Sequence, residues 1–148
     1  MGNDRHERLK PAGAIAPHDR LRRHRIPSLA RHLPRLRQEL ARWAAQVGMV
    51  PEDVTDLVLA CHEAMANVVD HAYADGGGDF DLDAVWAAER RQVTVTVTDH
   101  GHWTPAAYDA QSLRGRGLKI IRALAHAVAL THDTAGTRVV MSWRTGPV

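Results

Sequence analysis

Residues 79–99, DFDLDAVWAAERRQVTVTVTD, contain two runs in which apolar and polar side chains alternate. In the first run the apolar side chains stand at even positions, from Phe80 to Trp86. In the second run valines stand at odd positions, from Val93 to Val97, with threonines between them. Alternation with period two predicts strands that bury one face and leave the other polar. The intervening residues 87–91 are the expected turn, so this stretch predicts two neighbouring antiparallel strands.

Two amphipathic helices are predicted upstream of these strands. The first would be capped by Ser28 and would run to about Val47, because leucines recur there at three- and four-residue steps. The second would begin at Pro51, which suits the first turn of a helix, and end near Tyr73. The glycines at 76–78 cannot easily continue it.

Downstream of Asp99, a segment without periodicity reaches Arg114 and is expected to be a loop. A third helix is predicted from Leu118 to about Ala127, with Val128 as its last apolar anchor. A closing strand pair is expected at 128–131 and 137–143. This order of elements predicts an α+β fold, a two-layer α/β sandwich with helices on one face of a mostly antiparallel sheet.

The chain of 148 residues is long enough for one domain, and 45% of its residues are hydrophobic. Cys61 is its single cysteine, which excludes an internal disulfide framework and a zinc site with several cysteines. No apolar run approaches the roughly 20 residues that cross a bilayer, and no secretory signal is recognisable. The sequence therefore predicts a cytoplasmic protein that does not enter a membrane.

Positive charge is concentrated at the N-terminus. Residues 1–25 contain seven basic and three acidic side chains, whereas the remaining residues contain 12 basic and 14 acidic ones. We therefore expect residues 1–21 to form a flexible basic arm before a folded domain at 22–148. The arm has no aromatic residue that could stack on bases, so no direct nucleic-acid binding is expected.

The second predicted helix carries a polar stripe. Steps of four residues place Glu63, Asn67 and His71 on one helical face. The amide oxygen of Asn67 could ligate a hard cation such as Mg²⁺, and Glu63 could accept a proton beside it. The alternative is an ordinary solvated helix face.

Two further positions follow predicted strands. The carboxylate of Asp99 could accept a hydrogen bond from an exocyclic amino group such as that of adenine, and Gly101 would let the base approach the backbone. Thr137, after Gly136, could place a hydroxyl near a ligand. The alternatives are a strand-ending turn and a hairpin corner.

A glycine-rich junction precedes the third helix. Gly115 and Gly117 would expose backbone N–H groups to phosphate at the helix N-terminus, and Arg114 and Arg116 would add positive charge. A simple loop-to-helix junction is the alternative.

The succession of these motifs resembles a known family. The run 63–73, EAMANVVDHAY, is similar to the N box of Bergerat-fold ATPases as found in bacterial anti-sigma factor serine/threonine kinases. Residues 99–101, 115–118 and 136–141 resemble the three boxes that follow. The resemblance spans about residues 22–144 and implies the Bergerat ATP-binding fold, with its histidine-kinase-like ATP-binding domain.

The resemblance implies that the cofactors are ATP and Mg²⁺. It implies Asn67 as the metal ligand, Glu63 as the catalytic base, Asp99 as the acceptor for the adenine amino group, and Thr137 beside adenine. The expected nucleotide-binding residues are Asn67, His71, Asp99, Gly101, Arg114, Gly115, Arg116, Gly117, Leu118 and Thr137.

The family also implies partners. Its members phosphorylate a serine or threonine of a STAS-domain anti-anti-sigma protein, hold a sigma factor inactive and are often homodimers, so a homodimer is expected. This sequence departs from the pattern at Trp103, where many relatives have a glycine. The alternative is therefore a nucleotide-dependent protein-binding module without kinase activity.

These assignments share one spatial requirement. Asn67, Asp99 and the paired glycines must converge around a single hollow of nucleotide size. A hydrophobic plug that fills the space between them would count against the site.

Overall fold

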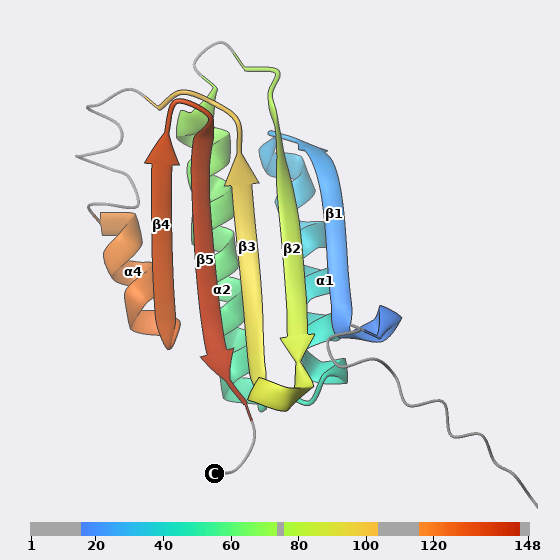
Figure 1. Ribbon diagram of the computed structural model, residues 1–148. Coiled ribbons are helices and arrows are strands. Elements are labelled where there is room, and N and C mark those ends of the chain that lie inside the picture. Colours follow the sequence, from blue (N-terminus) through green and yellow to red (C-terminus); the bar gives the residue numbers. More distant parts are fainter. Residues whose placement is uncertain (1–15, 74–75, 104–115, 146–148) are drawn as a thin grey trace, which may run out of the picture.

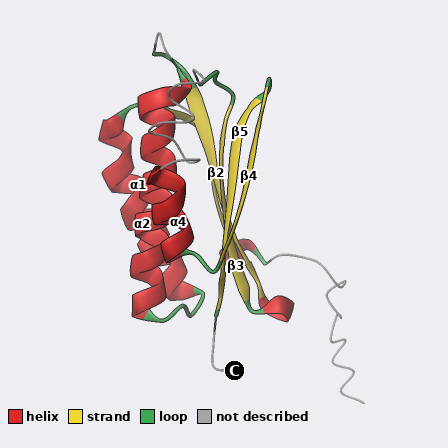
Figure 2. Cartoon of the chain, turned by 90° about the vertical axis from the view of Figure 1, so that its left-hand side faces the viewer, coloured by secondary structure: helices red, strands yellow, loops and turns green. Residues whose placement is uncertain are grey.

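The computed structural model describes residues 16–73, 76–103 and 116–145. Within them, three α-helices pack on one face of a five-stranded antiparallel sheet, as Figures 1 and 2 show. This arrangement confirms the predicted two-layer α+β sandwich. The elements are η1 (Pro17–Asp19), β1 (Arg20–Pro27), η2 (Ala30–His32), α1 (Leu33–Gln46), α2 (Pro51–Asn67), the π-helical turn η3 (Val68–Ala72), β2 (Asp79–Ala87), η4 (Ala88–Arg90), β3 (Gln92–Asp99), α4 (Arg116–Leu124), β4 (Ala127–Asp133) and β5 (Gly136–Arg144).

The strands are ordered β1-β2-β3-β5-β4 (Figure 1). The predicted alternation is realised, because Phe80, Leu82 and Ala84 of β2 and the three valines of β3 are buried. Trp86, at the far end of β2, is half-buried. The helices cover this apolar face (Figure 2), and the threonines of β3 lie on the opposite face.

The sequence analysis did not anticipate β1. Four basic residues of the positively charged N-terminal stretch lie in this strand, which pairs with β2: Arg20, Arg22, Arg23 and Arg25. The strand begins two residues before the boundary expected at residue 22. Its alternation is interrupted by an irregularity between Arg23 and Ile26, with Arg25 in the left-handed region at φ 53°. A bulge of this kind hides the period of two, and charged side chains suit an edge strand.

Two helix boundaries also differ from expectation. Ser28 does not cap the first helix, since α1 begins at Leu33 after the short turn η2. The third helix ends at Leu124, whose carbonyl accepts a hydrogen bond from Trp143 Nε1 at 3.0 Å. Val128, which was expected both as the last anchor of this helix and as the first residue of the closing strand pair, lies in β4, opposite Met141. Tertiary contacts therefore override the helical spacing that predicted a longer helix.

The core lies between the helices and the sheet. Its largest fully buried side chains include Trp143, Phe80, Leu40 and Leu57. Cys61 is fully buried on α2, and burial raises the pKa of its thiol. Among the described helices, none has the length and apolarity needed to span a membrane.

The β4–β5 turn approaches the end of β3 through Gly136. Its φ is 138°, and an added Cβ would lie 1.9 Å from the carbonyl oxygen of Asp99. Gly48, by contrast, has φ 94° with no atom within 4 Å of an added Cβ. The positive φ favours glycine at both positions. Only at Gly136, of these two, would an added side chain also collide with the backbone.

We predict that Gly136→Ala lowers the free energy of unfolding by about 2–4 kcal/mol, from backbone strain plus overpacking, and Gly48→Ala by about 1 kcal/mol, from strain alone. Urea unfolding of the two variants measures the difference. Equal losses would contradict the close approach at Gly136.

Candidate functional site

The residues singled out by the motifs gather at one edge of the molecule. The C-terminal end of α2, the end of β3 and the β4–β5 turn meet there, at the upper edge in Figure 1. In the sheet, Asp99 pairs with Phe80 on one side and Thr137 on the other, and Thr137 pairs with His132. Paired residues point to the same face of a sheet, so these side chains form a row beneath the helix layer.

Asp99 is a buried carboxylate, with a side chain only 1% exposed. One oxygen, Oδ1, accepts a hydrogen bond from the backbone N–H of Gly101 at 3.0 Å, and Oδ2 accepts one from Trp103 Nε1 at 3.3 Å. Burial raises the pKa of the carboxyl, while these donors and the backbone N–H of Thr137 act in the opposite direction. The site therefore holds an acceptor in a largely desolvated position.

Asn67 ends α2 and is 8% exposed. Its Nδ2 is buried and has no hydrogen-bond partner within the described chain. Leaving such a group unsatisfied costs about 1–3 kcal/mol, so the position is poorly explained by folding alone. A buried amide N–H group without a partner is suited to donate a hydrogen bond to a bound molecule.

His71 and Glu63 lie on either side of Asn67 along the chain, and both are half-buried. The regular helix gives way to the π-helical turn at Val68, so the four-residue spacing predicted up to His71 is not kept. The imidazole of His71 nevertheless faces the site, with its ring centroid 5.4 Å from that of Trp103.

Gly101 is buried where the chain leaves β3. An added Cβ would lie 2.0 Å from the carbonyl oxygen of Ala72, and that carbonyl accepts a hydrogen bond from His102 N at 2.9 Å. The expected reason for this glycine was close approach of a base to the backbone. The structure supplies another reason, which is close approach of the π-helical turn.

Tyr73 completes this attachment. Its hydroxyl donates a hydrogen bond to the carbonyl of Asp79 at the start of β2 and accepts one from the backbone N–H of His100 at 3.1 Å. The consecutive residues His71, Ala72 and Tyr73 thus each contact the segment at or beyond the end of β3. Sequence reasoning included these three residues in the run 63–73 that resembles the N box, but it did not identify their structural roles.

Thr137 is 3% exposed, and its hydroxyl oxygen lies 2.6 Å from His132 Nδ1. Sequence reasoning missed His132. The turn at Asp133–Gly136 was the available signal, because a hairpin closed there pairs residue 132 with 137.

The glycine-rich junction is placed only in part. Gly117 and Leu118 are buried in the first turn of α4, which packs against α2. Arg114 and Gly115 lie outside the described residues, as does the side chain of Arg116. The structure therefore brings together Asp99, Gly101 and Thr137, with His71 linked to them through Trp103. Within the described ranges, the side chains of Glu63 and Asn67 make no hydrogen bond, ion pair or ring contact with this group.

Trp103 is the main unexpected neighbour. Its side chain is only 5% exposed and lies against both the strand-end acid Asp99 and the helix-end imidazole of His71. Sequence reasoning identified it only as a departure from the family pattern. The structure buries the indole among the candidate site residues. The indole therefore fills space between them, as a hydrophobic plug would, which counts against an open hollow of nucleotide size at this point.

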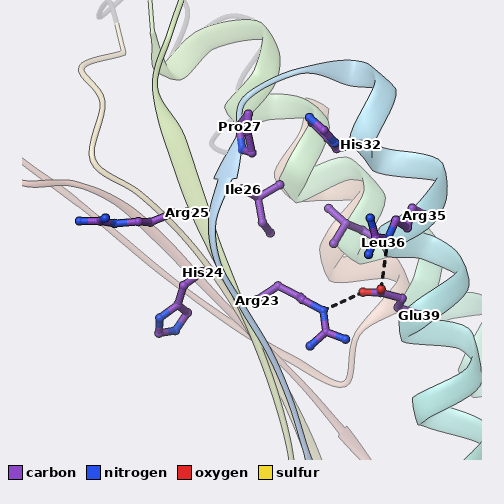
Figure 3. A pocket seen from close by; sticks show the side chains of 9 residues that line it. All are labelled: Arg23, His24, Arg25, Ile26, Pro27, His32, Arg35, Leu36 and Glu39. Atoms are coloured by element: carbon purple, nitrogen blue, oxygen red, sulfur yellow. Dashed lines mark hydrogen bonds and ion pairs between the residues drawn. The ribbon is translucent and has the colours of Figure 1, made fainter.

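A separate hollow of about 260 Å³ lies between β1 and α1 (Figure 3). Glu39 bridges Arg23 at 3.0 Å and Arg35 at 3.4 Å along its wall. The two guanidinium groups are thus engaged with this carboxylate. None of the motif residues lines the hollow.

Metal binding by protein groups alone is not supported. Within the described ranges, no cluster of three or more His, Cys, Asp or Glu side chains could hold a metal ion. A single amide oxygen, such as that of Asn67, holds Mg²⁺ in proteins together with water and substrate phosphates.

The chain is similar to proteins of a known family. The family described as the histidine kinase-like ATPase domain matches residues 26–143. Serine-protein kinase RsbW of Bacillus cereus strain AH820 is 26% identical over 136 residues, which cover 80% of this chain and 81% of the relative. RsbW of Bacillus thuringiensis strain Al Hakam is 25% identical over the same length.

Solved structures agree. A structure of the RsbU and RsbW domains of a Mycobacterium tuberculosis protein superposes with a TM-score of 0.69 and 25% identity, covering 85% of this chain and 32% of that one. This chain thus corresponds to about a third of that protein chain. The histidine kinase domain of a blue-light activated kinase from Erythrobacter litoralis shares the fold, with a TM-score of 0.57 at 23% identity, and covers 81% of this chain and 62% of that chain. These matches confirm the resemblance to anti-sigma factor serine kinases, and the chain belongs to the histidine kinase-like ATPase domain family.

Proposed function

We propose that this protein binds Mg²⁺-ATP at the edge formed by α2, β3 and the β4–β5 turn, and transfers phosphate to a serine or threonine of a STAS-domain anti-anti-sigma partner. We propose further that it holds a sigma factor inactive as a homodimer in the cytoplasm, where sigma factors act. The observation that carries the proposal is that two polar side chains are buried at this edge: the Asp99 carboxylate at the end of β3, and Asn67 at the end of α2, whose Nδ2 has no partner among the described residues.

The residues present fit a nucleotide and its metal. Each oxygen of an ionised carboxylate has more than one acceptor direction, so Asp99 could accept the adenine amino group. The Asn67 amide has an oxygen of the kind that Mg²⁺ prefers. When bound, ATP supplies the phosphoryl group, and Mg²⁺ neutralises charge on the phosphates.

Glu63 is suited to the acceptor side of the reaction. It lies one helical turn before Asn67, and side chains four residues apart on a helix are neighbours. The half-buried Glu63 carboxylate would accept the proton of the attacking serine or threonine hydroxyl. Asn67 and Asp99 would hold and orient the nucleotide and its metal ion, and of these three residues only Glu63 would accept a proton.

A second function is favoured by the burial of Trp103 against Asp99. A site closed in this way could bind nucleotide in order to regulate partner binding, without phosphotransfer. The protein would then be a nucleotide-dependent protein-binding module.

We predict that Asp99→Asn weakens Mg²⁺-ATP binding by about tenfold to a hundredfold, because a hydrogen bond to a charged group contributes about 1.5–3 kcal/mol. Asn67→Ala should weaken binding in the same range through loss of its oxygen. Calorimetric titration with Mg²⁺-ATP measures both effects.

Asp56→Asn is the matched control, since Asp56 is half-buried on the N-terminal half of α2, away from the site. It should leave the affinity unchanged. If Asp99→Asn and Asn67→Ala, shown by thermal unfolding to be folded, bind ATP as tightly as Asp56→Asn does, the proposed site is misplaced.

We predict that Glu63→Gln lowers phosphotransfer by about a hundredfold or more while leaving ATP affinity unchanged, because a positioned general base contributes about 10²–10⁴-fold. Transfer of radiolabelled phosphate to a STAS-domain protein that binds this chain measures the rate. A wild-type rate retained by Glu63→Gln would remove Glu63 from the chemistry. A wild-type protein that binds ATP but transfers nothing would instead identify the binding module.

A further inference from the structure

Trp103 combines three properties at the candidate site. Its indole is 5% exposed, donates a hydrogen bond from Nε1 to Asp99 Oδ2 at 3.3 Å, and contacts the His71 ring at a centroid distance of 5.4 Å and an interplanar angle of 45°. It thus lies between an acceptor from the sheet layer and a ring from the helix layer. Burial of an aromatic body with its N–H satisfied is a stable arrangement by itself.

The chemistry that Trp103 offers to Asp99 is close to that of adenine. Both are flat bicyclic rings that bury a large apolar face, and both present an N–H donor at one edge. The acceptor in question is the same buried carboxylate in both cases. A base that took the place of the indole beside Asp99 would need the volume that the indole fills, because protein interiors are close-packed.

We propose that the indole of Trp103 occupies the adenine position of this protein, closing the site from within, and that nucleotide binds only when the indole has left. This inference rests on the nucleotide-binding function proposed above. Trp103 would then determine the affinity for nucleotide. A protein whose binding-competent state is only partly populated binds its ligand more weakly, in proportion to that fraction.

The attachment of the backbone allows such an exchange. The bond from His102 N to the Ala72 carbonyl and the close contact at Gly101 fix the chain up to residue 102. The indole begins one residue later, so it can leave by rotation about its own side-chain bonds while both attachments remain. The 3.3 Å distance to Asp99 is also long for an N–H···O hydrogen bond, so little is lost when it breaks.

The test is calorimetric titration of the full chain with Mg²⁺-ATP for the wild type, Trp103→Ala and Trp103→Phe. We expect Trp103→Ala to bind Mg²⁺-ATP at least about tenfold more tightly than the wild type does. The open, binding-competent state of this variant no longer competes with a state closed by the indole. Trp103→Phe keeps an aromatic ring but loses the N–H donor, so its affinity should fall between the two.

Trp86→Ala is the matched control. Trp86 is half-buried at the opposite end of β2, where it pairs with Val93, and it should leave ATP affinity at the wild-type value. If the wild type binds ATP and Trp103→Ala binds no more tightly, the inference fails while the proposed function stands. If neither protein binds ATP, adenosine or ADP, the proposed function fails and takes the inference with it.

A spectroscopic measurement tests the exchange without relying on a truncated side chain. The indole N–H signal of Trp103, identified by its loss in Trp103→Phe, should be slow to exchange with solvent in the free protein. Saturating Mg²⁺-ATP should shift it and speed its exchange at least tenfold, while the signals of Trp43 and Trp143 stay in place. A Trp103 signal unchanged by bound ATP would overturn the inference.

Discussion

The site depends on the attachment of the π-helical turn to the end of β3. The Ala72 carbonyl accepts a hydrogen bond from His102, and Gly101 lacks the Cβ that would collide with that carbonyl. Elsewhere the helix and sheet layers are separated by apolar side chains of the core. Here backbone meets backbone, so the polar ends of α2 and β3 are held beside one another. π-helical turns are rare and are frequently found at functional sites, and this one places Ala72 against Gly101.

This edge also holds buried polar side chains, whereas most of the buried residues are apolar. Asp99 carries its carboxyl at 1% exposure, and its raised pKa reflects the cost of keeping a charge there. Asn67 Nδ2 is one of three buried polar side-chain atoms without a partner in the described residues; the other two belong to His32 and Trp43. Of these three residues, Asn67 lies at the end of α2, the helix that carries the N-box resemblance. Local violations of this kind are expected where binding, rather than folding, determined the residue.

Much of the fold followed from periodicity, because burial of one face imposes it directly. The alternation at 80–86 and 93–97 predicted β2 and β3, and the leucine spacing predicted most of α1. The strand β1 escaped prediction because its bulge at Arg25 breaks the alternation and its side chains are mainly arginines. The end of α4 escaped because it is set by Trp143, which is distant in sequence.

The site was predictable only through motifs, since contacts between layers leave no local period. Asp99, Gly101 and Thr137 were identified as separate strand-end signals, and their adjacency is a consequence of strand register. The role of Trp103 was not predictable, because a tryptophan in a loop has many possible packing partners. Its hydrogen bond to Asp99 exists only once β3 and the segment after it are folded together.

The buried carboxylate constrains how the site can open. Asp99 needs donors at all times, because a buried charge without partners is strongly destabilising. In the closed arrangement the Trp103 indole supplies one of them. On the exchange that we propose, the adenine amino group would replace the indole N–H, so the number of hydrogen bonds to Asp99 would be conserved. The long indole bond of 3.3 Å would be exchanged for a shorter one from the amino group, so Asp99 itself would favour the bound state. Ring contact with His71 would favour the closed state, and phosphate and metal contacts at Asn67 and the phosphate-binding segment would add to the affinity of the bound state.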